Sequence, residues 1–211
     1  MNESIAIQVP ANAPSGSALL EASASGCKAM VQLLLKKGVN VNACCREYGS
    51  ALQAASLNGH EAIVRLLLDN GADIHVEGGI EGSVLRAASA RGHEAIVRLL
   101  LSKGADVNEQ GFFYRCPLEA PMVGGNEIIV RLLLNKGANV NLHKGDRHSA
   151  LQAASMRGNV TIVYLLLEKG AAVNGQHGHY GSALQAAAVG GHKTIVRLLL
   201  ERRALMWMIG E

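Results

Sequence analysis

The sequence predicts an all-α solenoid of stacked helical hairpins, because it combines a fixed period, a repeated helix start and two glycine columns. Each copy holds two short helical segments, and a period filled in this way is typical of an array in which each unit contacts only its neighbours. We expect one elongated repeat domain over residues 16–203, made of units 16–48, 49–81, 82–114, 115–147, 148–180 and a shorter 181–203. The 33-residue spacing joins Gly16, Gly49, Gly82, Arg115, His148 and Gly181.

The segments that flank the repeats lack the period. Residues 1–15 contain Pro10, Pro14 and small polar residues, so we expect a loose N-terminal lead-in. At the other end Arg203 replaces the terminating glycine, and the apolar run ALMWMIGE makes residues 204–211 an atypical tail. Since solenoid ends need a polar cover, either Trp207 folds back onto the last unit or the chain normally continues.

The first helix of a unit is predicted by Ser-Ala-Leu-Gln, which begins at Ser50, Ser149 and Ser182. In this S-x-x-Q capping box the serine hydroxyl accepts the third helical amide, and the glutamine reaches back to the serine amide. Small residues follow, and Gly59 is expected to end the helix in the left-handed conformation. Pro121 is expected inside the helix of the fourth unit, where the missing amide costs about 3 kcal/mol. The fourth unit is therefore the expected weak point.

The second helix is expected to begin at a column of His or Asn, where Asn is a good N-cap. In the second unit its body runs from Ile63 to Leu68, and apolar residues cover too much of its circumference for a helix with one solvent-exposed face. It should therefore lie as an inner layer between neighbouring helices. An Asn or Asp two residues after the closing glycine favours a turn, and a projecting loop follows. The two columns are His60, His93, Asn126, Asn159 and His192, then Gly38, Gly71, Gly104, Gly137 and Gly170.

Composition limits the class of partner and the compartment. The net charge of +3 is spread through the units, so neither nucleic acid nor membrane is indicated. The four cysteines lack C-x-x-C spacing, which indicates free thiols in a reducing compartment. No signal peptide or run of about 20 apolar residues is present. We expect an intracellular, cytoplasmic protein, and a nuclear location is also compatible with the sequence.

Catalytic chemistry is not indicated, so we expect no enzyme, no cofactor and no metal. His177 and His179, near His143 and His148 in sequence, form an H-x-H pair without a third ligand of fixed spacing.

A nucleic-acid interface is not indicated by the arginine column either. Three of its four arginines follow a glutamate by four residues, the spacing that pairs along a helix face and neutralises it. The column is Arg65, Arg98, Arg131 and Arg197, with Glu61, Glu94 and Glu127 before the first three.

The second-helix sequences GHEAIVRLLLDNGADIH, GHEAIVRLLLSKGADVN and NEIIVRLLLNKGANVN resemble those of ankyrin repeats, over residues 16 to about 202. The family's Thr-Pro-Leu-His start is Ser-Ala-Leu-Gln in three units here, and Cys116-Pro117-Leu118-Glu119 keeps the proline. The resemblance implies L-shaped repeats of two antiparallel helices with an outward loop or β-hairpin, stacked in a curved solenoid. It also implies a non-catalytic protein that binds partners with its hairpin tips and the concave face.

The wording YGSALQAAS is similar to that of fungal ankyrin arrays, including those of nucleotide-binding, heterokaryon-incompatibility-type receptors. The sequence contains no G-x-x-x-x-G-K-[ST] loop. Two functions therefore remain open, an interaction scaffold or adaptor and a sensor or regulatory segment of a larger nucleotide-binding signalling protein.

Partner contacts are expected where the copies differ. Five of the seven aromatic residues fall in the loops, where rigid aromatic anchors suit protein recognition. The tyrosine column either contacts a partner or packs between alternate hairpins, whereas Phe112 and Phe113 have no counterparts and are assigned to a partner. The column of Leu57 and Met156 is either an apolar groove on the concave side or core. The candidate partner-binding residues are Tyr48, Leu57, Phe112, Phe113, Tyr114, Arg147, Met156, His177, His179 and Tyr180. We expect a monomer that binds protein partners.

Overall fold

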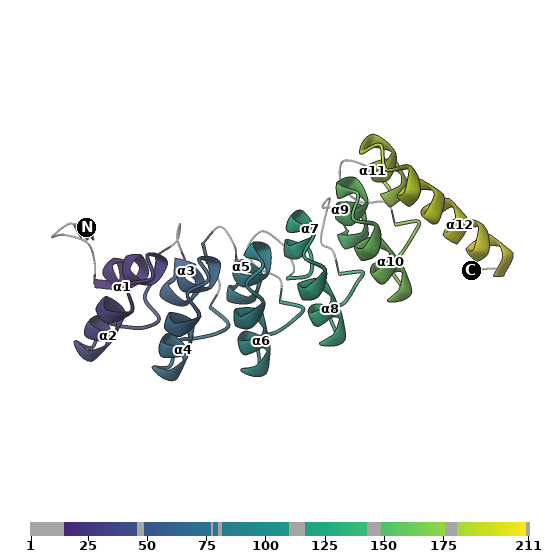
Figure 1. Cartoon of the computed structure of the whole chain (residues 1–211). Coiled ribbons are helices and arrows are strands. Elements are labelled where there is room, and N and C mark those ends of the chain that lie inside the picture. The colour runs from purple at the N-terminus through teal and green to yellow at the C-terminus, as the bar shows by residue number, and fades with distance from the viewer. Residues whose placement is uncertain are drawn as a thin grey trace.

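Two layers of helices run side by side along the described chain, which comprises residues 15–45, 49–76, 78–79, 82–109, 117–142, 149–175 and 181–209 of this computed structural model. Figure 1 shows a curved row of helical hairpins with the first helices on the inner side of the curve and the second helices on the outer side. The first helices are α1 (Ser15–Ala24), α3 (Ala51–Leu57), α5 (Val84–Arg91), α7 (Ala120–Gly124), α9 (Ala150–Arg157) and α11 (Ala183–Val189). The second helices are α2 (Lys28–Lys36), α4 (Glu61–Asp69), α6 (Glu94–Ser102), α8 (Glu127–Asn135), α10 (Val160–Glu168) and α12 (Lys193–Ile209). The expected all-α solenoid is confirmed.

The predicted capping boxes are present at all three Ser-Ala-Leu-Gln starts. At α3 the Ser50 hydroxyl accepts the Gln53 amide at 3.2 Å, and the Gln53 side chain accepts the Ser50 amide at 2.7 Å. Ser83 caps α5 in the same way by accepting the amide of Arg86 at 3.2 Å. The sequence motif therefore fixes where the first helix begins.

Glycine ends the helices as predicted. Gly59 follows α3 with φ of +79°, and a Cβ built on it would lie 2.6 Å from the His93 imidazole of the next unit. Gly71 closes the following hairpin with φ of +83°, yet nothing lies within 4 Å of its added Cβ. The first glycine column is thus needed for both conformation and space, and the second for conformation alone.

The core is a continuous layer between the two rows of helices. In α4 the side chains of Ile63, Val64 and Leu67 are at most 2 % exposed, and their counterparts in α6, α8 and α10 are buried as well. Alanines of the first helices, such as Ala55 and Ala88, are also fully buried and let neighbouring units approach. The second helices bury their apolar side as predicted, but they form the outer row of the array and keep one exposed face, so the expectation of an inner layer is wrong.

Pro121 does not lie inside a regular helix, so that expectation is wrong. Residues 117–119 form a turn, and α7 begins at Ala120 with Pro121 in its first turn. An amide in the first turn has no intrahelical acceptor, so its absence costs little. A helix that began at position 117, as in the other units, would bring the proline ring against the carbonyl of residue 117. The helix therefore starts later and avoids the cost.

The His and Asn column has a role that its sequence does not show. Asn126 caps α8 by accepting the Ile129 amide at 3.1 Å, as expected, whereas Asn159 makes no capping bond. The Asn159 amide instead donates to the Met122 carbonyl of the preceding unit at 3.3 Å. His60 and His93 likewise place Nε2 3.0 Å from the carbonyls of Ala24 and Leu57. Four members of the column, His60, His93, Asn159 and His192, therefore tie their second helix to the first helix of the preceding unit.

The backbone stays helical across the expected boundary at residue 203, since α12 runs from Lys193 to Ile209. The absence of a glycine at position 203 accounts for this continuation, because the other second helices end at the glycine column. The Trp207 side chain lies outside the described atoms.

Candidate functional site

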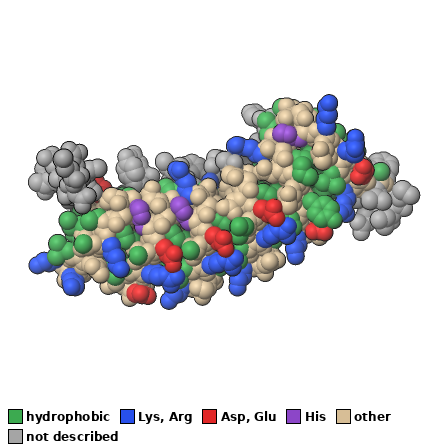
Figure 2. Space-filling model, viewed as in Figure 1, with side chains coloured by type: hydrophobic (Ala, Val, Ile, Leu, Met, Phe, Trp, Pro, Cys, Tyr) green, Lys and Arg blue, Asp and Glu red, His purple; other side chains and the backbone are tan. Residues whose placement is uncertain are grey.

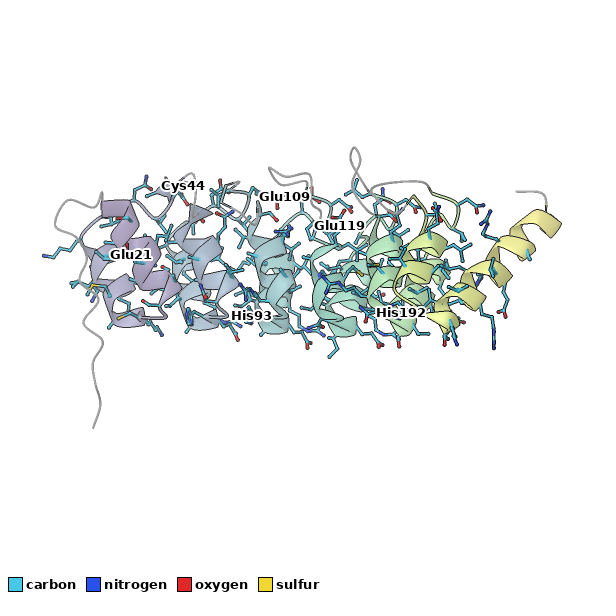
Figure 3. All side chains as sticks on the ribbon, turned by 90° about the horizontal axis from the view of Figure 1, so that it is seen from above. Glu21, Cys44, His93, Glu109, Glu119 and His192 are labelled. Carbon is cyan, nitrogen blue, oxygen red and sulfur yellow. The ribbon has the colours of Figure 1, made fainter. Side chains whose placement is uncertain are left out.

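The roots of the loops are the first candidate for a binding surface. β1 (Cys44–Cys45) pairs antiparallel with β2 (Gly49–Ser50), and a single bridge joins Gly78 to Gly82 one unit later. Short hairpins therefore leave the helical stack at equivalent places in the first two intervals between units. Figure 3 shows Cys44 and Glu109 along one edge of the stack, whereas His93 and His192 lie along the opposite edge.

An asparagine column holds successive loops in register. Asn42 donates its side-chain amide to the Gly71 carbonyl at 3.1 Å and accepts the Asp73 amide at 2.7 Å. Asn108 makes the equivalent bonds to the next unit, at 3.1 and 2.7 Å. Asn141 donates to the Gly170 carbonyl at 2.9 Å and accepts the Ala172 amide at 2.8 Å. These bonds join the first loop to the second, the third to the fourth and the fourth to the fifth, and the sequence signal for them is the recurrence of Asn at this position, which His75 interrupts.

Leu57 and Met156, at the ends of first helices, are half-buried, and so lie neither in the core nor fully in solvent. Their backbone carbonyls accept from the imidazoles of His93 and His192 at 3.0 Å. Val189, at the same register position in the last unit, is 65 % exposed. The column therefore presents a partly apolar strip whose backbone is engaged in stacking.

The other candidate contact residues lie outside the described part of the chain. These are Tyr48, Phe112, Phe113, Tyr114, Arg147, His177, His179 and Tyr180. Their assignment to a partner stays a prediction.

The outer face of the second helices carries the ion pairs predicted for the Glu and Arg columns. Arg65, Arg98 and Arg131 each lie 2.7 Å from the glutamate one turn earlier, and all six side chains are partly exposed. Exposed pairs of this kind contribute little stability. They neutralise the outer face of units two to four, as expected.

Unit five breaks this pattern, a feature that sequence reasoning missed. Val160 and Tyr164 occupy the positions of the Glu and Arg, and their side chains are 41 % and 46 % exposed. Figure 2 shows acidic and basic side chains along the outer helices giving way to hydrophobic ones over α10. The gap in the two charged columns was the available signal.

Among the described residues, no three His, Cys, Asp or Glu side chains gather closely enough to hold a metal ion. Within the same ranges, no helix is long and apolar enough to cross a membrane.

Comparison with known families agrees with this architecture. The model described as "Ankyrin repeats (3 copies)" matches residues 5–78 and 118–207, and the model "Ankyrin repeat" matches residues 83–112. Such repeats generally mediate protein–protein interactions and are typically non-catalytic. No curated protein matches the chain. Because the matched residues make up well over half of the sequence, the chain belongs to the ankyrin-repeat family.

Proposed function

We propose that this protein is a non-catalytic scaffold or adaptor that binds a partner protein through its hairpin tips and the concave face of the array. The observation that carries the proposal is the asparagine column, because Asn42, Asn108 and Asn141 each join one loop to the next. A row of loops held in register is pre-organised, and pre-organisation lowers the entropy lost on binding.

The proposed contact residues are of two kinds. Loop aromatics, together with Arg147, His177 and His179, supply anchors of the type that dominate protein interfaces. Half-buried Leu57 and Met156 supply apolar surface on the first helices. The aromatic members are Tyr48, Phe112, Phe113, Tyr114 and Tyr180.

Site-specific photo-crosslinking tests this surface. A benzoylphenylalanine at Phe113 should crosslink a partner in the source cell, and the same group at Arg65, on the outer face, serves as the control. Combined Phe112→Ala and Tyr114→Ala substitutions should remove the Phe113 crosslink. The proposal fails if Arg65 alone yields a crosslinked partner, or if the Phe113 crosslink survives both substitutions.

The wording YGSALQAAS favours one elaboration of this function, a fungal-type array that acts as the regulatory segment of a larger nucleotide-binding signalling protein. A longer transcript that encodes an upstream phosphate-binding loop would support it, and a transcript that encodes the repeats without such a loop would count against it.

We place the protein in the cytoplasm as a monomer. The four cysteines lack C-x-x-C spacing, which favours a reducing compartment. Light scattering of the purified protein checks the monomer, and imaging of a tagged chain checks the compartment.

A further inference from the structure

The exchange of an ion pair for two apolar side chains on α10 has no explanation in the packing of the array. The side chains of Val160 and Tyr164 are 41 % and 46 % exposed, so the core does not require them. They stand one turn apart, as Glu127 and Arg131 do on α8, and side chains at this spacing are neighbours on a helix surface. We call Val160 and Tyr164 the outer apolar pair.

The neighbouring helix carries positive charge at the same two register positions. On α12, Lys193 replaces the Glu of units two to four and Arg197 keeps their Arg, and both side chains are exposed. Neither is within ion-pair distance of an acidic side chain among the described residues. Two other acidic groups belong to these helices, Glu168 one turn after Tyr164 and Glu201 one turn after Arg197, and Glu201 lines the same hollow as Lys193 and Arg197. We call Lys193 and Arg197 the outer cationic pair.

The two pairs form one surface. α10 packs against α12, and packed helices lie about 8–10 Å apart. A helix is about 10 Å wide, so one helix can contact both rows at once.

We propose that this outer face of α10 and α12 binds an acidic amphipathic helix of a partner protein. Two apolar residues one turn apart on the partner contact Val160 and Tyr164. Two carboxylates on the adjoining stripe meet Lys193 and Arg197, which is the helix-in-groove mode of recognition. Charge complementarity favours an acidic partner, because Lys193 and Arg197 are two neighbouring cations beside a single carboxylate, Glu201, whereas Arg65, Arg98 and Arg131 are each paired with a glutamate. The surface lies on the second helices, so it is separate from both the loops and the concave face.

A labelled synthetic helix tests the proposal. The probe is a fluorescent 16-residue peptide with leucines one turn apart and glutamates on the adjoining stripe. Its control carries lysine in place of every glutamate. Fluorescence anisotropy should show saturable binding of the acidic peptide to the full chain, with the basic peptide at least about tenfold weaker.

The repeats themselves supply variants that should fold. Val160→Glu with Tyr164→Arg restores the residues of units two to four and should weaken binding about tenfold or more, since buried aromatic anchors dominate such interfaces. Lys193→Glu restores the Glu and Arg pattern on α12 and should weaken binding and flatten its salt dependence. Glu61→Ala with Arg65→Ala, on the same face of α4, is the matched control and should bind as the wild type does. Circular dichroism verifies that each variant is folded.

Three results would overturn the proposal. They are the absence of saturable binding, equal binding of both peptides, and wild-type affinity in the Val160→Glu, Tyr164→Arg variant. A wild-type dimer that this variant converts to a monomer would also overturn it, because the occupant would then be a second copy of the chain.

Discussion

Gln53 and Gln185 hold the same position in their units but have different surroundings, so they test how much stacking contributes. Gln53 is 4 % exposed, and its side-chain amide donates to the carbonyl of Gly78, in the loop that ends its own unit, and to that of Gly82, the first residue of the next unit, each at 3.0 Å. Gln185 is exposed, and within the described residues it makes only the capping contacts with Ser182. The local capping role is shared, whereas in the described part of the chain the bonds to the following loop and to the next unit are made by Gln53 and not by Gln185.

Alanine substitution should therefore have unequal effects. A hydrogen bond contributes about 1 kcal/mol net, and a capping interaction about 1 kcal/mol. Gln53→Ala should lower the free energy of unfolding by about 3 kcal/mol, and Gln185→Ala by about 1 kcal/mol. Urea titration followed by circular dichroism gives both values, and hydrogen exchange shows whether the last unit opens separately. If the two substitutions cost the same, the bonds from Gln53 do not stabilise the stack and the reasoning is refuted.

Three further substitutions test other parts of the array. Gly59→Ala should cost about 2 kcal/mol or more, from left-handed strain plus the clash with the next imidazole, while Gly71→Ala should cost only the strain, about 1–2 kcal/mol; equal losses in urea titration would contradict this. Pro121→Ala should leave the thermal midpoint unchanged or lower it, because the proline in the first turn of α7 restricts the unfolded chain; a raised midpoint would favour a helix-interior proline. Arg86 is 6 % exposed and Glu119, at the same position one unit later, is half-buried. Arg86→Gln alone should cost about 3 kcal/mol, and Arg86→Gln with Glu119→Gln should cost at least about 1 kcal/mol less than the sum of the single changes; additive losses would show that the two charges are not coupled.

Features set by local chemistry could be predicted from the sequence. The capping box at Ser50 needs only Gln53 three residues later, and Gly59 needs only its own missing side chain. Both features depend on residues within one turn of helix, so the sequence of each repeat predicts them independently. The period then extends them to the whole fold.

Features set by contacts between units could not be predicted in the same way. His60 was read as a helix start, yet its imidazole reaches the Ala24 carbonyl, 36 residues earlier. The place where α7 begins depends on how the chain avoids a clash at Pro121 while keeping the stack intact. The candidate site was predicted in loops that differ between copies. A similar difference at Tyr164 was missed, because the other second helices from α4 to α12 carry arginine at this position.

Burial separates the two reasons for which repeat copies differ. Where Arg86 and Glu119 replace the glutamine column, the change is at least half-buried and opposite in charge between neighbouring units, so it bears on the stability of the stack. Where Val160 and Tyr164 replace an ion pair, the change is exposed and no packing contact requires it. A buried difference between copies therefore reports on stability, and an exposed one reports on recognition. By this criterion the outer face of α10 is as strong a candidate for partner contact as the first-helix strip of Leu57 and Met156.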